Sequence, residues 1–200
     1  ARPLGRAFGD HTVYGLALFN QQTRLEAADV PENFRGYSLR VGYDFRSRYM
    51  FEFNWGYNGT DRFKAQKRYG SFPAVSAGWN ISEEPFFKNN ITFVDHFKIR
   101  GSVGEVGNDK FPNSFQYLYE EIYETPNQNY NFGESPTTSG VVTPGALANE
   151  DVRWERERKI DVGVELRMLK GKLEVIADYF DTYRYDILTS RESNGKTYWT

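Results

Sequence analysis

Apolar and polar residues alternate with a period of two over much of the chain. Between residues 36 and 45 every second position is large and apolar, and the alternation resumes over residues 49–58 after the short polar connection at 46–48. This period is that of a β-strand with one apolar and one polar face. The two segments predict a long antiparallel hairpin, with the apolar faces Tyr37, Leu39, Val41, Tyr43 and Phe45, and Tyr49, Phe51, Phe53, Trp55 and Tyr57.

The same signature recurs in five further segments. They are residues 11–20, where the alternation is less clean, and residues 71–80, 97–105, 160–167 and 173–179. Helical patterns are almost absent, apart from a short turn within residues 82–96. The sequence therefore predicts an all-β chain of about seven strands.

The connections between these strands differ in length in an ordered way. Those expected at one end of the sheet are long, at residues 21–33, 59–70 and 106–157. Those at the other end are residues 46–48, 81–96 and 168–172, of which only 81–96 exceeds a tight turn. Short turns on one side and long loops on the other are typical of outer-membrane barrels.

Strand length and the placement of aromatic rings favour the same architecture. The predicted strands have about ten residues, as a tilted membrane strand does, whereas strands of soluble proteins usually have five or six. Rings lie at strand ends, where an aromatic girdle meets the lipid headgroups. We predict an antiparallel transmembrane β-barrel segment with a water-filled lumen. Its candidate lumen-lining residues are Arg40, Glu52, Asn54, Lys98, Arg100, Asp161 and Glu165.

Composition narrows the possibilities further. The longest nearly apolar run, Val13–Phe19, has seven residues, far fewer than the roughly 20 of a helical span. A net charge of −2 without a polybasic block argues against nucleic acid as a partner. The absence of cysteine excludes a disulfide framework and a thiolate site. The 17% of aromatic residues beside a mean hydropathy of −0.69 fits a sheet with one apolar and one wet face.

Seven strands do not close a barrel by themselves. Open edges in lipid would leave backbone N–H and C=O groups without partners, at several kcal/mol each. We therefore expect residues 1–200 to be part of one larger barrel domain.

Four stretches in chain order resemble the SusC/RagA family of TonB-dependent outer-membrane transporters from Bacteroidetes. They are FNWGYNGTDRFKAQKRYGSFPAVSAGWNISEE (53–84), FKIRGSVGEVGND (97–109), NEDVRWERERKIDVGVEL (149–166) and LEVIADYFDTYRYDIL (173–188). The second departs from the family at Val103, where an aromatic residue is usual. The resemblance implies a 22-stranded barrel with an internal plug, a SusD-like surface lipoprotein as a lid, and TonB as the energy-coupling partner. The plug and the TonB box are expected outside residues 1–200.

Residues able to carry catalysis are few. His11 and His96 are the only histidines, and neither lies in a ligand-spaced cluster. Adjacent glutamates at 83–84 and 120–121 fit solvated loop charges better than an acid–base pair for glycoside cleavage. We therefore expect no enzyme activity, no catalytic residue, no metal and no cofactor.

The long connection at 110–149 mixes aromatic with amide and hydroxyl side chains. Such a loop could stack on sugar rings or contact a lid protein, or it could pack only on itself. The candidate residues for ligand or lid contact are Phe115, Tyr117, Tyr119, Tyr123 and Tyr130.

Two functions from different classes remain. The first is an active importer in the bacterial outer membrane that takes up oligosaccharides, or peptides as the second choice, while contacting membrane lipid. The alternative is a soluble all-β glycan-binding or structural module, whose aromatic faces would pack against a second sheet. The surroundings of the aromatic face of residues 49–58 distinguish the two.

Overall fold

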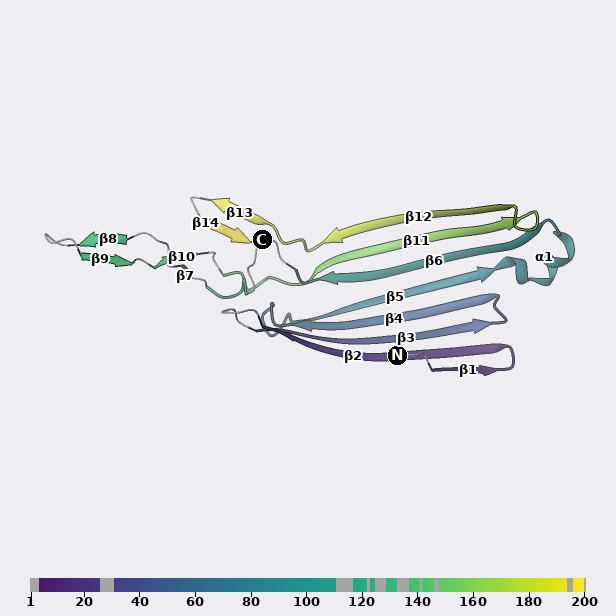
Figure 1. Ribbon diagram of the computed structural model, residues 1–200, viewed down its shortest axis with the longest axis horizontal. Helices are drawn as coiled ribbons and strands as arrows, with labels where there is room; N and C mark the ends of the chain where they lie inside the picture. Colours follow the sequence, from purple (N-terminus) through teal and green to yellow (C-terminus); the bar gives the residue numbers. More distant parts are fainter. Residues whose placement is uncertain are drawn as a thin grey trace.

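Eight strands form one antiparallel sheet (Figure 1). The computed structural model describes residues 4–25, 31–110, 117–121, 123–124, 129–132, 137–140, 142–145, 148–193 and 196–199. The sheet strands, in spatial order, are β1 (Leu4–Phe8), β2 (His11–Arg24), β3 (Glu32–Phe45), β4 (Tyr49–Thr60), β5 (Tyr69–Asn80), β6 (Val94–Asn108), β11 (Glu155–Met168) and β12 (Leu173–Tyr185).

The remaining elements lie at the two ends of this sheet. At the end with short turns, η1 (Ile81–Glu83) and α1 (Pro85–Asn90) form the helical turn predicted within residues 82–96. At the end with long loops there are three small two-stranded pairings. They are β7 (Tyr123–Glu124) with β10 (Thr143–Pro144), β8 (Asn129–Phe132) with β9 (Thr137–Gly140), and β13 (Ser190–Ser193) with β14 (Lys196–Trp199). We call these the turn end and the loop end.

The predicted hairpin forms with the predicted faces. Tyr37 lies opposite Tyr57, and Val41 lies opposite Phe53, so the two apolar rows share one face of the sheet. The connecting turn passes through positive φ at Arg46 (52°) and Ser47 (55°). Two successive left-handed residues match the twist of a tight hairpin, although glycine or asparagine is the usual choice there. The Asp44 carboxylate, which accepts a hydrogen bond from the Ser47 backbone N–H at 2.8 Å, helps to hold the turn.

The sheet differs from the prediction in strand number and length. It contains β1 in addition to the seven predicted strands, and those seven have 12 to 15 residues rather than about ten. A five-residue strand with a glycine at its second position offers too little alternation to detect. The extra length extends the other strands beyond the roughly 9 to 11 residues that cross a bilayer.

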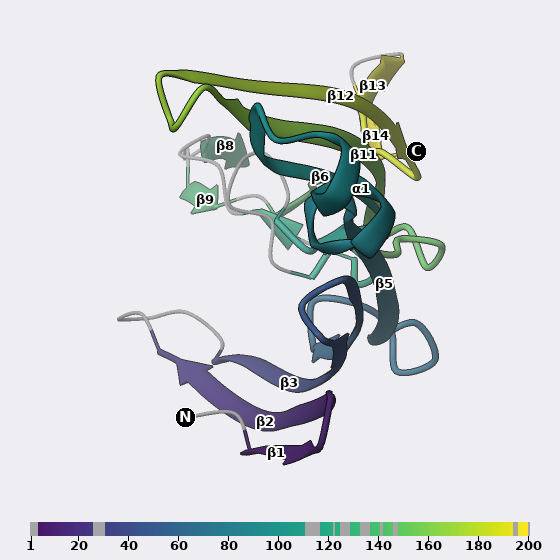
Figure 2. The same ribbon diagram turned by 90° about the vertical axis from the view of Figure 1, so that its right-hand side faces the viewer.

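Viewed along the strands, the sheet is a single curved layer (Figure 2). Within the part of the chain that the structure describes, no second layer packs against it. Large apolar side chains of β4 and β12 are therefore uncovered, with Phe51 50% and Tyr179 68% exposed. No helix among the described residues is long and apolar enough to cross a membrane.

A small core lies at the loop end, where the strands emerge. Phe63 and Phe72 pack on Trp154, with ring centroids 5.4 and 5.3 Å away, and the indole Nε1 donates to the Arg68 carbonyl at 3.0 Å. These residues come from the β4–β5 loop, from β5 and from the segment before β11. We call this cluster the loop-end core; its buried members are Phe63, Phe72, Leu118, Val152, Trp154 and Leu188.

A second, smaller packing site closes the turn end. Ile81 and Phe87 are buried there, and the nearly buried Glu84 accepts hydrogen bonds from Tyr49 Oη at 2.6 Å and Trp79 Nε1 at 3.2 Å. The hydrogen bond from Tyr49 lowers the pKa of Glu84 below its ordinary value. The carboxylate thereby ties the helical connection to the ends of β4 and β5.

Candidate functional site: the polar face of the sheet

The seven candidate lumen residues lie on one face of the sheet, opposite to the aromatic rows. Arg40 pairs in register with Asn54, Gly42 with Glu52, and Lys98 with Glu165. Directly opposed residues of an antiparallel pair point to the same side, so the register carries this face across β3 to β11. We call it the polar face.

One group of side chains on the polar face lies over β2 to β4. Arg40 Nε donates to Asn54 Oδ1 at 2.7 Å, and Asn54 Nδ2 donates to Glu52 Oε1 at 2.8 Å. Tyr14 Oη donates to the other carboxylate oxygen of Glu52, also at 2.8 Å. Tyr14 reaches Glu52 by lying across Gly42 of β3, where a Cβ would stand 2.0 Å from its ring Cζ. Glycine is thus required at this close approach.

A second group surrounds Arg100 on β6, β11 and β12. Its guanidinium lies 2.6 Å from Asp178 Oδ1, 3.1 Å from Glu165 Oε1 and 3.7 Å from Asp161 Oδ1. The contact between Arg100 Nε and Glu165 is an ion pair but not a hydrogen bond, and Arg100 Nε has no hydrogen-bond partner among the described residues. Three carboxylates thus face one arginine in this group.

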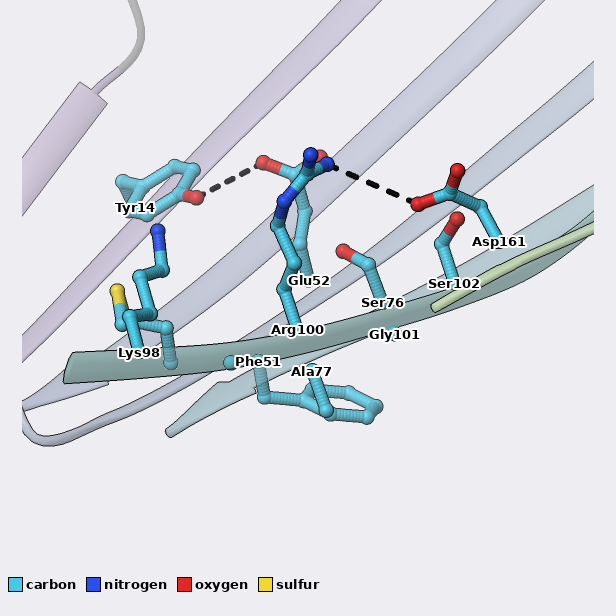
Figure 3. A pocket seen from close by; sticks show the side chains of 12 residues that line it. Tyr14, Phe51, Glu52, Ser76, Ala77, Lys98, Arg100, Gly101, Ser102 and Asp161 are labelled. Atoms are coloured by element: carbon cyan, nitrogen blue, oxygen red, sulfur yellow. Dashed lines mark hydrogen bonds and ion pairs between the residues drawn. The ribbon is translucent and has the colours of Figure 1, made fainter. Parts of the chain in front are cut away.

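Between the two groups lies a hollow of about 300 Å³ (Figure 3). Its polar lining comes from β2, β4, β5, β6 and β11, and such distant strands can share one hollow only on the concave side of a curved sheet. In Figure 3 the labelled polar side chains stand on one side of β6, and Phe51 and Ala77 on the other. The polar lining residues are Tyr14, Glu52, Ser76, Lys98, Arg100, Ser102 and Asp161.

The chemistry of this site is that of hydrogen bonding and charge. Hydroxyl, amide, carboxylate and guanidinium groups can bind a polar solute or a polar protein surface. Among the described residues, no three His, Asp or Glu side chains are placed to hold a metal ion. The cross-strand contact that Tyr14 makes with Glu52 was not predicted. The signal for Tyr14 would have been its register opposite Gly42, which alternation within one strand does not reveal.

The aromatic residues predicted for ligand or lid contact fall into three groups. Tyr117 and Tyr119 donate their hydroxyls to the Pro31 and Asp61 carbonyls at 2.8 and 3.3 Å, so they pack on neighbouring loops. Tyr123 is 62% exposed. Phe115 lies outside the described residues, and of Tyr130 only the backbone, in β8, is described. Their role in ligand or lid contact stays a prediction.

Known proteins similar in sequence are receptors of one kind. No protein-family model matches the chain. TonB-dependent receptor P39 of Formosa agariphila is 31% identical over 149 residues, covering 74% of this chain and 13% of that protein. TonB-dependent receptor SusC of Bacteroides thetaiotaomicron is 29% identical over 154 residues, covering 77% and 15%. The chain therefore spans less than a sixth of the length of these curated relatives.

Solved structures with the same fold include the RagAB peptide importer in its closed-closed state. The TM-score is 0.75 at 14% identity, over 93% of this chain and 23% of that one. The siderophore receptor PirA from Pseudomonas aeruginosa has a TM-score of 0.56 at 12% identity, over 98% and 35%. The sequence and structure matches together confirm the predicted resemblance to SusC/RagA transporters, the all-β barrel segment and the outer-membrane location. These relatives are receptors and importers rather than enzymes.

Proposed function

We propose that the chain is a wall segment of a TonB-dependent importer in the bacterial outer membrane. The observation that carries the proposal is the single-layer sheet (Figure 2), with large apolar side chains uncovered on one face and hydrogen-bonded charged side chains around a hollow on the other. In a barrel, the first face meets lipid and the second lines the water-filled interior. The sequence similarity to TonB-dependent receptors supports the same function.

The soluble alternative requires a second sheet over the aromatic face. Within the described residues none is present, and Phe51 is half exposed. An apolar surface of this extent is unusual on a soluble monomer. The structure therefore favours the importer over a soluble glycan-binding or structural module.

We further propose the partners and cargo of the whole protein. A SusD-like surface lipoprotein would close the barrel at the loop end, and TonB would act through a plug and a TonB box in other parts of the protein, residues 1–200 being barrel. Oligosaccharides are the first proposed cargo and peptides the second, the latter because RagAB is a peptide importer. Transport by gating needs no bond-making residue, so no enzyme activity is proposed.

Two arginine substitutions at neighbouring positions of β4 test the assigned faces. Phe53→Arg places a charge toward lipid and is expected to cost about 2 to 4 kcal/mol of folding free energy if it lies near the bilayer midplane. Asn54→Arg, on the polar face, should cost much less. Urea unfolding of the full-length protein in lipid vesicles measures both. Equal costs for the two variants would contradict the barrel.

Uptake itself is tested in cells that lack the gene. Labelled oligosaccharides and peptides are supplied separately, and the cells are complemented with the wild-type gene. Recovery of uptake of one cargo class upon complementation supports the importer and identifies the class. Unchanged uptake of both classes in the deletion strain would contradict the proposed cargo.

A further inference from the structure

On the aromatic face of the sheet, a row of four rings crosses β2 to β5 near the loop end. Phe19 and Tyr37 have ring centroids 5.1 Å apart, Tyr37 and Tyr57 6.4 Å, and Tyr57 and Tyr69 5.1 Å, the last pair stacked. Amphipathic rings in this position lie at the level of the lipid headgroups. The row therefore marks the loop-end border of the apolar zone.

Immediately beyond this row the same face carries a hollow of about 490 Å³. Arg35 stands two residues nearer the loop end than Tyr37, about 7 Å along the strand, and pairs in register with Gly59. Its side chain is exposed and makes no hydrogen bond or ion pair with any residue that the structure describes. The lining residues are Asn33, Arg35, Gly59, Thr60, Asp61, Arg68 and Tyr69.

The walls of the hollow are held in place by the surrounding structure. The Tyr69 ring lies over Gly59, where a Cβ would come within 2.4 Å of it, so the absence of a side chain at Gly59 makes room for the ring. Arg68 is anchored by a hydrogen bond of 3.2 Å from Nε to the Phe63 carbonyl. That bond uses one of its five N–H donors and leaves the rest for an acceptor.

Asp61 and Asn33 are joined at one side of the hollow. Asp61 Oδ2 accepts from the backbone and side-chain nitrogens of Asn33, both at 2.9 Å, whereas Oδ1 is buried without a hydrogen-bond donor among the described residues. A ligand that complements this hollow thus carries an anionic group for the two arginines and hydroxyl groups for the polar lining, which includes the exposed Asn33.

We propose that this hollow binds the phosphorylated sugar headgroup of an outer-leaflet glycolipid. Arginine pairs with phosphate oxygens through two parallel hydrogen bonds, and the sugar supplies hydroxyl donors. The position fits because the site lies on the lipid side of the wall, just beyond the aromatic row. This inference rests on the proposed location of the chain in an outer-membrane barrel. The bound headgroup would fix the orientation of the barrel relative to the lipid surface beside the loops.

The test uses the full-length protein in lipid nanodiscs and counts bound lipid by native mass spectrometry. The probes are a phosphorylated glucosamine-disaccharide lipid and the same lipid with its phosphate removed. The wild-type protein is expected to bind the phosphorylated lipid roughly tenfold more tightly. The double variant Arg35→Gln with Arg68→Gln should lose this preference. The comparison of the two probes on wild-type protein does not depend on the folding of any variant.

Arg158→Gln is the matched control. Arg158 is exposed on the same face at the loop end, opposite Glu105 in register and outside the hollow, so the preference should remain in this variant. Equal binding of the two lipids by wild-type protein overturns the inference. So does an undiminished preference in the double variant, or an equal loss in Arg158→Gln. Wild-type protein recovered outside the outer-membrane fraction overturns the proposed function as well, whereas inserted protein without the preference overturns only the lipid site.

Discussion

The wall of the sheet and the loop-end core differ in what surrounds their large apolar side chains. On the wall, Phe51 and Tyr179 are 50% and 68% exposed in the chain alone. In the loop-end core, Phe63 and Leu118 are 0% and 1% exposed. Wall residues thus rely on lipid and on the next strand's backbone hydrogen bonds, whereas core residues rely on partners from distant parts of the chain.

This difference explains how two segments outside the sheet strands are held in place at the loop end. The β4–β5 loop and the segment before β11 are held by Trp154 and by an ion pair of 2.6 Å between Lys67 Nζ and Asp151 Oδ1. The lysine lowers the pKa of Asp151 below its ordinary value. Both segments are thus held by contacts with each other as well as by the strands that they join.

The largest expected effect comes from emptying the core. Trp154→Ala should destabilise the loop end by about 3 to 5 kcal/mol, because the cavity would be lined by protein atoms that cannot follow the lost ring. Trp55→Ala on the wall is the matched control and should cost less, since lipid can fill the space. Limited proteolysis of the loops and unfolding in vesicles measure the two changes. Equal costs would remove the distinction between the regions.

A smaller effect is expected on the polar face of the wall. Gly42→Ala places a methyl group where the Tyr14 ring lies and should cost about 1 to 3 kcal/mol through overpacking, with loss of the hydrogen bond to Glu52. Gly15→Ala is the control, because its Cβ would meet nothing nearer than the Arg40 carbonyl at 3.8 Å. Unfolding midpoints in detergent compare the variants. A neutral Gly42→Ala would mean that Tyr14 moves freely.

The smallest effect concerns the acid sensitivity of the turn end, where the Glu84 carboxylate accepts its hydrogen bonds. Because its hydrogen bonds lower the pKa of Glu84 in the folded state, the carboxylate contributes stability above about pH 4.5. That contribution disappears as the pH falls through the lowered folded-state value. Glu84→Gln should therefore be less stable than wild type at pH 7, and the gap should narrow below pH 4.5. Thermal unfolding across this range measures the gap; a constant gap would contradict the assignment.

Much of the fold could be predicted because alternation is a local property. The faces of β3 and β4 follow from the side chains within each strand, and the register between them places Tyr37 against Tyr57 as expected. The short β1 was missed, since five residues with a glycine among them carry little signal. The polar candidates share one face for the same local reason, although their role in a lumen remains a proposal.

What the sequence determined by itself was therefore the division of the chain into two-faced strands and the side on which each residue stands. Only the tertiary structure decided which side chains meet. Tyr14 reaches Glu52 over Gly42 because the register of three strands aligns them. Phe63, Leu118 and Trp154 form a core because loops far apart in sequence converge at one end of the sheet. Such contacts depend on strand register and on the path of the loops, which are properties of the whole chain and not of any one segment.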